Sequence, residues 1–116
     1  MPVRTVGSLA IDAVVVVVFA AIGRASHDED LSIAGIATTA WPFLVAVVVG
    51  SLLGRRLGDD SWWRQGLVVW VVTAVGGILL RVASGTSAAP GFVIVGSTFL
   101  ALFLFGWRFA ASRRRA

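Results

Sequence analysis

Apolar residues are concentrated in four long runs along this chain, and most polar and charged residues lie between them. The runs cover Val6–Gly23, Ile33–Gly54, Gly66–Ala83 and Gly91–Phe109. Each is about 18–22 residues long, the length of an α-helix that crosses a hydrocarbon layer of about 30 Å. The pattern therefore predicts an all-α fold. We expect one transmembrane domain over residues 1–116, built as a four-helix bundle.

Composition supports a membrane protein and narrows the classes of partner. Hydrophobic residues make up 58% of the chain and the mean hydropathy is +0.91, values that exclude an ordinary soluble domain. The net charge of +4 would suit nucleic-acid binding in a soluble protein. Here the arginines flank apolar runs, so the expected partner is the lipid bilayer, and no nucleic acid. The absence of cysteine excludes disulfides and thiolate metal sites.

All ten basic residues are arginines, and they divide unevenly between the two sides that four alternating spans define. Only Arg24 and Arg81 fall on one side, near an acidic stretch at residues 28–30. The other eight fall on the opposite side: Arg4, Arg55, Arg56, Arg64, Arg108, Arg113, Arg114 and Arg115. The positive-inside rule therefore predicts a multi-pass protein of the cytoplasmic (plasma) membrane with both termini in the cytoplasm.

The two halves of the chain resemble each other at an offset of 56 residues, with the run that begins at Phe43 matching the run that begins at Phe99. Under this alignment Gly50 corresponds to Gly106. One interpretation is a repeat of two helical hairpins related by a pseudo-two-fold axis along the membrane normal. The other is convergence, because apolar helices that end in arginine look alike. If the repeat exists, each pair should lie at one depth.

Asp12 interrupts the first apolar run about 9 Å from its start, by helical rise. A carboxylate at such depth is costly and by default suggests function, here an ion or proton path. The alternative is a structural carboxylate. We expect no arginine at its level. A structural carboxylate would be hydrogen-bonded by Ser51, Trp70 and Thr73, or reached by Arg55 or Arg64 from the interface. In either case, Asp12 should face the bundle interior.

Polar residues near the other side predict an outward-facing pocket, formed by Thr38, Trp41, Arg81 and Thr98. Arg81 should form salt bridges with the acidic stretch at 28–30, and an anion site shared with Arg24 is the less favoured alternative. His27 beside these carboxylates is too weak a pattern for a metal site. We therefore expect no metal and no cofactor, and list His27 only as a candidate functional residue.

Gly50 and Gly54 form a small-xxx-small pair in the second run, a pattern that allows close approach between membrane helices. The contact could lie within the bundle, or it could join a homo-oligomer or another membrane protein. The sequence does not decide between these arrangements.

Three stretches carry a family resemblance: FAAIGRASHDE at 19–29, TAWPFL at 39–44 and LLR at 79–81. With them the chain resembles the bacterial and archaeal family catalogued as domain of unknown function three-zero-five-four, small four-helix membrane proteins common in actinobacteria. The resemblance covers nearly the whole chain. It implies the same topology and supports a set of candidate residues, and it implies no activity. That set comprises Asp12, Arg24, His27, Trp41, Pro42 and Arg81.

Three functional classes follow from these observations. A small transporter or channel for an ion or small solute would use Asp12 and the predicted pocket. An accessory or assembly subunit would bind another membrane protein through its small-residue faces. A lipid-modifying enzyme ranks last, because the sequence shows no nucleophile with a base and no set of metal ligands. We therefore expect a protein that is not an enzyme.

Overall fold

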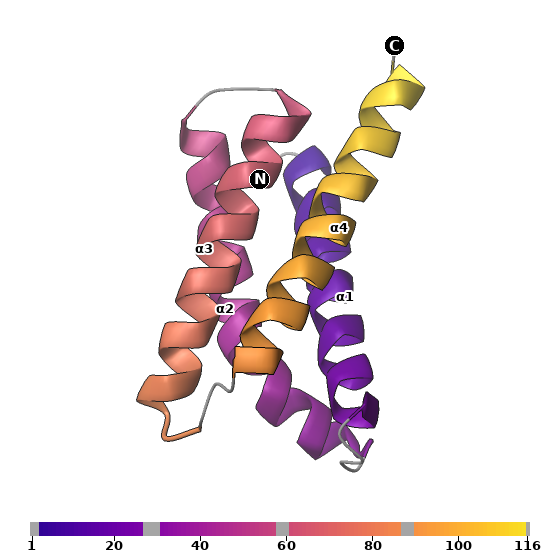
Figure 1. Cartoon of the computed structure of the whole chain (residues 1–116). Helices are drawn as coiled ribbons and strands as arrows, with labels where there is room; N and C mark the ends of the chain where they lie inside the picture. Colours follow the sequence, from indigo (N-terminus) through magenta and orange to yellow (C-terminus); the bar gives the residue numbers. More distant parts are fainter. Residues whose placement is uncertain (1–2, 27–30, 58–60, 87–89, 116) are drawn as a thin grey trace.

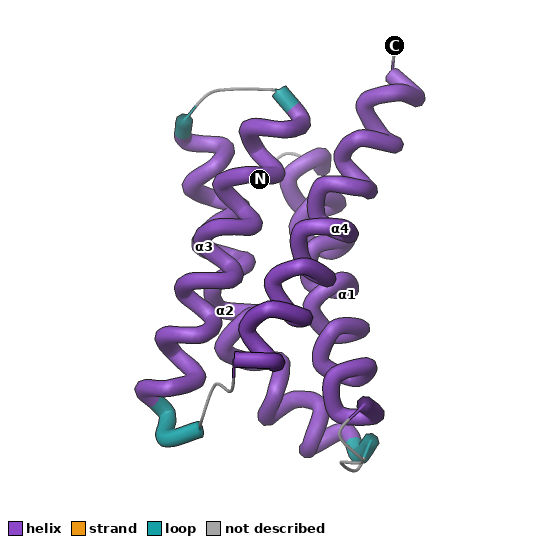
Figure 2. The backbone as a smooth tube through the Cα atoms, in the orientation of Figure 1, coloured by secondary structure: helices purple, strands orange, loops and turns teal. Residues whose placement is uncertain are grey.

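The computed structural model describes residues 3–26, 31–57, 61–86 and 90–115, and these form four α-helices joined by short connections (Figure 1). No strand occurs in these ranges (Figure 2). The helices are α1 (Val3–Ser26), α2 (Ile33–Arg56), α3 (Trp62–Ala83) and α4 (Pro90–Arg115). All four are long and apolar enough to cross a membrane. The predicted all-α, four-helix architecture is confirmed, and the chain is a multi-pass membrane protein.

The helices run alternately up and down, and each packs against its neighbours in the order α1, α2, α3, α4 and back to α1. The packing is closest between α2 and α3 and sparsest between α1 and α4. Both termini lie at the same end of the bundle as the connection between α2 and α3 (Figure 1). We call this the arginine-rich end, because α2 ends, α3 begins and α4 ends there with Arg55, Arg56, Arg64, Arg108, Arg113 and Arg114.

The helices extend beyond the apolar runs that predicted them. The first begins at Val3, the third begins at Trp62 instead of Gly66, and the fourth continues past Phe109 to Arg115. Hydropathy marks only the part of a helix that lies in hydrocarbon. Arginine is a good helix former and suits the negative end of the helix dipole, so α4 can continue through its final arginines.

Local sequence accounts for the helix ends. Ser32 is the N-cap of α2, and its hydroxyl accepts a hydrogen bond from the Gly35 amide at 3.0 Å. After α3, Gly85 adopts a φ of 90°. The Thr86 amide donates to the Arg81 carbonyl, and the Gly85 amide donates to that of Val82. This Schellman arrangement requires a left-handed residue, which glycine supplies without steric cost.

The interior is narrow and the outer surface is apolar, as expected of a bundle surrounded by lipid. Phe43, Val47 and Leu104 are buried in the core. Leu79, Ile94 and Leu102, in contrast, are about two-thirds exposed. Large apolar side chains turned outward along a whole bundle are stable in lipid and costly in water.

Gly50 allows the close packing of α2 on α3. A Cβ atom added there would lie 3.2 Å from the Cα of Val69. Gly54 is also buried and faces Val68, with 3.9 Å available. The small-residue row is therefore used inside the bundle. A contact with a partner through Gly50 and Gly54 stays a prediction.

Candidate functional site

Asp12 lies in the interior of the bundle at the level where α4 approaches its arginine-rich end, and none of its surface is exposed. Its predicted inward orientation is confirmed. Arg108 of α4 forms a two-pronged ion pair with it. Nη1 of Arg108 donates to Oδ1 of Asp12 at 2.8 Å, and Nη2 donates to Oδ2 at 2.7 Å. Parallel bonds of this kind combine charge with a fixed orientation.

Two further donors complete the coordination of the carboxylate. The indole Nε1 of Trp107 donates to Oδ1 at 2.9 Å, and the hydroxyl of Ser51 in α2 donates to Oδ2 at 3.0 Å. Each oxygen of Asp12 thus accepts two hydrogen bonds. We call Asp12, Ser51, Trp107 and Arg108 the Asp12 cluster. It joins three helices at one level.

The position of Arg108 corrects the expectation that no arginine reaches the depth of Asp12. Arg108 is 6% exposed and also donates to the Leu104 carbonyl at 3.1 Å, one turn earlier in α4. Side chains on a helix lean towards its N-terminus. The N-terminus of α4 lies at the far end of the bundle, so this lean carries the guanidinium inward. Because α4 continues to Arg115, Arg108 lies two turns inside the helix.

Of the donors predicted for Asp12, only Ser51 reaches it. The Trp70 indole instead donates to the Ser97 carbonyl at 2.9 Å. The Thr73 hydroxyl is fully buried and has no hydrogen-bond partner among the described residues. Arg55 donates to the Ser8 hydroxyl at 3.3 Å, and the Arg64 guanidinium lies over the Trp63 ring at 5.0 Å.

The Asp12 cluster bears on the proposed repeat. Ser51 follows Gly50, Trp107 follows Gly106, and both side chains reach the same carboxylate. The two glycines therefore lie at similar depth, as the repeat requires. Their surroundings differ, because Gly50 abuts α3 while a Cβ at Gly106 would meet nothing within 4 Å. The superposition of the two hairpins stays a prediction.

The arginines of the opposite end make contacts with helix residues. Nη1 of Arg24 donates to the Thr39 hydroxyl at 3.0 Å, which ties α1 to α2. The guanidinium of Arg81 lies 4.4 Å from the centre of the Phe92 ring, a cation–π contact between α3 and α4. His27 and the acidic residues 28–30 lie outside the described residues, so the predicted bridge from Arg81 stays a prediction.

The residues named for the predicted outer pocket line neither of the two pockets described below, and the pocket stays a prediction. Thr38 and Thr98 are exposed, and each hydroxyl donates to the carbonyl one turn earlier, in Ala34 and Ile94, at 2.8 Å. Trp41 is 42% exposed on the outer surface. A threonine in a helix can satisfy its hydroxyl on its own backbone, so it need not point towards a shared cavity.

Aromatic rings fill the bundle between the Asp12 cluster and the opposite end. The ring of Phe19 lies 5.1 Å from that of Phe43, 5.8 Å from that of Phe92 and 5.9 Å from that of Phe99. Edge-on and tilted contacts at these distances are favourable. This aromatic cluster contains one of these rings from α1, one from α2 and two from α4.

Beside the aromatic cluster, a groove of about 400 Å³ opens between α1 and α4. We call it the α1–α4 groove. Gly23 and Gly91 form part of its wall, and at both positions an added Cβ would meet nothing within 4 Å. The other lining residues are Phe19, Ile22, Phe92, Val95, Gly96 and Phe99. The groove is thus apolar and lies where two neighbouring helices pack least closely.

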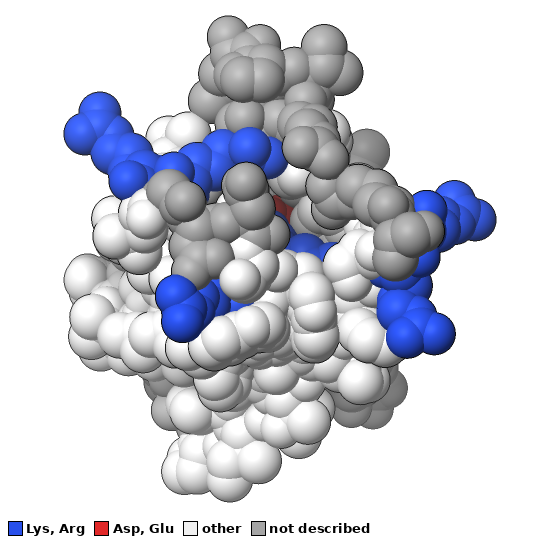
Figure 3. Space-filling model, turned by 90° about the horizontal axis from the view of Figure 1, so that it is seen from above, with Lys and Arg blue, Asp and Glu red and all other residues white. Residues whose placement is uncertain are grey.

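Seen from the arginine-rich end, the bundle carries arginine side chains around its rim, and among the described residues acidic surface is visible deep between them (Figure 3). Asp12 is the one acidic residue in the described ranges, and Arg108 balances its charge. Among these residues no three histidine, cysteine, aspartate or glutamate side chains come together as metal ligands. The site is therefore a closed ion pair beneath a ring of exposed positive charge.

Comparison with known proteins assigns a family and no activity. No curated protein and no solved structure matches the chain. A family model described as protein of unknown function (DUF3054) matches residues 9–111, which include the whole Asp12 cluster. This match over most of the sequence, and not the short stretches around Arg24, Trp41 and Arg81, establishes membership. The chain belongs to the DUF3054 family of proteins of unknown function.

Proposed function

We propose that this protein is a small transporter or channel for an ion or small solute, with the Asp12 cluster as its gate. The observation that carries the proposal is the buried Asp12–Arg108 pair, which joins α1 to α4 inside the membrane-spanning region. Ionisable residues at such positions are costly and commonly mark pathways for ions or solutes.

The least closely packed helix pair is the natural place for a gate. Between α1 and α4 the arginine-rich half is held by the ion pair, the middle by the aromatic cluster, and the other half is open as the α1–α4 groove. Breaking one two-pronged contact would leave this helix pair free to separate. Closely packed α2 and α3 would then serve as the fixed part of the bundle.

The proposal includes an orientation. Exposed arginines surround the end that holds both termini, and positive residues near spans favour the cytoplasmic side. We therefore propose that the arginine-rich end lies on the cytoplasmic side of the cytoplasmic membrane. The Asp12 cluster then lies a few turns of helix below that surface. The groove then opens towards the outer leaflet. We also propose that the protein is not an enzyme.

Flux through liposomes tests the gate directly. The chain has no cysteine, so Ile22→Cys and Val95→Cys place two unique thiols on the opposite walls of the α1–α4 groove. Bridging them with a short cleavable bifunctional reagent should stop flux of the transported ion or solute, and cleaving the reagent should restore it. The matched controls are the two single-cysteine variants treated in the same way, which should keep their flux.

The same liposomes test the Asp12 cluster. We expect Asp12→Asn to change or abolish flux, while Arg113→Gln, an exposed arginine at the same end, leaves flux near that of the parent protein. A panel of monovalent cations, monovalent anions and small neutral solutes is measured across a range of pH. No flux above that of empty liposomes for the whole panel would reject the transport proposal.

A second candidate function is an accessory or assembly subunit, and the α1–α4 groove favours it. Its two open glycines would allow a helix of another membrane protein to approach closely. This surface joins the Gly50–Gly54 row as a candidate contact. A partner recovered from native membranes by the parent protein and lost with Gly91→Leu, together with absent flux, would favour this function over transport.

A further inference from the structure

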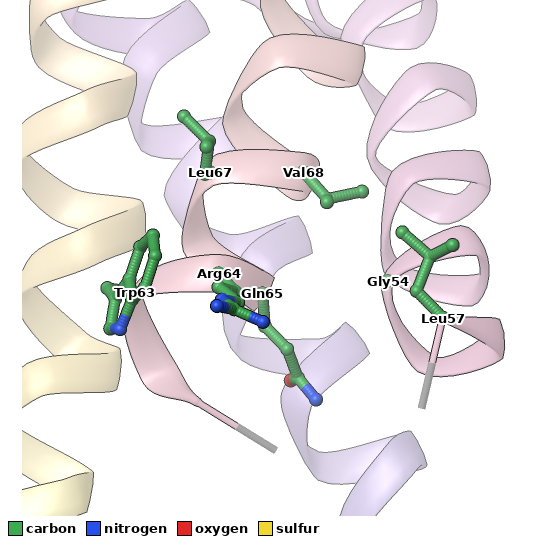
Figure 4. Close-up of a pocket in the computed structure, with 7 residues that line it drawn as sticks. All are labelled: Gly54, Leu57, Trp63, Arg64, Gln65, Leu67 and Val68. Atoms are coloured by element: carbon green, nitrogen blue, oxygen red, sulfur yellow. The ribbon is translucent and has the colours of Figure 1, made fainter. Parts of the chain in front are cut away.

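A second hollow lies at the arginine-rich end, between the last turns of α2 and the first turns of α3 (Figure 4). Its volume is about 350 Å³, within the range of about 300–1,000 Å³ typical of small-ligand sites. We call it the α2–α3 pocket. It is lined by Gly54, Leu57, Trp63, Arg64, Gln65, Leu67 and Val68. None of these residues belongs to the Asp12 cluster, so the pocket is separate from the proposed gate.

The pocket has an apolar wall and a polar rim. Val68 points across the gap between the two helices towards the side of Leu57, whereas Leu67, the residue before Val68, points away from Leu57 (Figure 4). Gly54 contributes no side chain, which leaves the space beside Val68 open. Arg64 and Gln65 lie nearer the end of α3, and Trp63 carries the Arg64 guanidinium over its ring. A ligand that fits must be amphipathic.

The positive charge beside the α2–α3 pocket favours a ligand with an anionic headgroup. Arg64 is exposed, and Arg55 and Arg56 end the neighbouring helix. Residues 55–64 contain these three arginines against Asp59 and Asp60, so the segment has a net positive charge. A guanidinium has five N–H donors in a fixed fork and can bind a phosphate while keeping other contacts.

The exposure of the lining side chains and the size of the pocket favour a lipid as the ligand over a helix of another protein. Leu57, Trp63 and Leu67 are each more than two-fifths exposed along the outside of the bundle, where acyl chains surround it. A half-exposed tryptophan at a helix end is typical of the boundary between headgroups and hydrocarbon. An α-helix is about 10 Å across with its side chains, too wide for a pocket of this volume.

We infer that the α2–α3 pocket binds one anionic phospholipid, with its phosphate on Arg64 and Gln65 and its upper acyl chain between Leu57 and Val68. Anionic lipids already collect near arginines through diffuse attraction, worth about 1 kcal/mol per basic residue near the surface. The pocket adds a defined position, because the phosphate and the chain are held by different parts of the same hollow.

Thermal unfolding in a neutral detergent tests the site. Short-chain phosphatidylglycerol should raise the unfolding temperature in a saturable way, because a ligand that binds only the folded state stabilises it. Phosphatidylcholine with the same chains should raise it less, and inorganic phosphate at the same concentration should have little effect. Equal responses to both lipids would overturn the anionic headgroup, and an equal response to phosphate alone would overturn the lipid.

Two matched variants separate the pocket from general charge. Arg64→Gln should weaken phosphatidylglycerol binding about tenfold, the effect of losing one charge-assisted contact. Arg114→Gln removes an exposed arginine at the same end and should keep the affinity of the parent protein. Leu67→Phe adds volume to the lining and should also weaken binding. Equal affinities of the Arg64→Gln and Arg114→Gln variants would show that phosphatidylglycerol binding depends only on the total charge of the protein.

Discussion

At the scale of single residues, the Asp12 carboxylate shows how a buried charge is tolerated in a spanning helix. Four donor contacts from three side chains reach its two oxygens. The desolvation of such a pair roughly offsets its attraction, so the pair itself adds little net stability. Removing one member, in contrast, leaves an uncompensated charge in a region with little water. The cluster therefore constrains the fold more than it stabilises it.

Replacing both partners should cost less than the sum of the two single replacements. We expect Asp12→Leu or Arg108→Leu alone to lower the free energy of unfolding by about 3–5 kcal/mol. The double variant should lose clearly less than the sum of the two, because no buried charge remains. Unfolding in mixed detergent micelles measures all three. Arg114→Leu, an exposed arginine on the same helix, is the control and should change stability by about 0.5 kcal/mol or less. Additive losses would contradict a coupled pair.

At the scale of helices, the bundle has one tight contact and one loose one. Gly50 brings α2 against the backbone of α3, while α1 and α4 touch mainly through the ion pair and the aromatic cluster. The sequence shows the row of small residues, but helices that are apolar on all sides do not reveal which face meets a neighbour and which meets lipid. The side on which Gly50 packs therefore needed the structure.

The two glycines of this row should respond differently to the same substitution. At Gly50 a Cβ would lie 3.2 Å from the Cα of Val69, so Gly50→Ala must push α2 and α3 apart and should cost about 1–3 kcal/mol. At Gly54 the nearest atom is 3.9 Å away. Gly54→Ala should be neutral or gain up to about 1 kcal/mol from helix propensity. Equal effects in a detergent unfolding assay would show that α2 and α3 are not closely packed at Gly50.

At the scale of the whole molecule, alternating helices place both termini at one end, and arginines surround that end. The lengths of the apolar runs were enough to predict this arrangement. The pairing of Asp12 with Arg108 was not predictable, because it depends on the extension of α4 to Arg115 and on the register of α1 against α4. The hydrogen bonds of the Thr38 and Thr98 hydroxyls to their own helices were not predictable either, because the sequence does not show which acceptor a helical threonine chooses.

The orientation in the membrane can be read with single thiols. Ser112→Cys lies in α4 at the arginine-rich end, and Ser84→Cys follows α3 at the opposite end. In intact cells, a maleimide that does not cross membranes should label the thiol at 84 and leave that at 112 unlabelled. After the cells are permeabilised, both should react. Labelling of residue 112 in intact cells would place the termini outside and contradict the proposed orientation.

The ion pair between the first and fourth helices can form only when synthesis of the chain is nearly complete. Asp12 enters the bilayer early, and its partner lies 96 residues further along the chain. At ribosomal rates of about 5–20 residues per second, the carboxylate spends roughly 5–20 s without Arg108. A nascent chain that stops before α4 therefore keeps an acidic group among its spans without the charge of Arg108 to balance it.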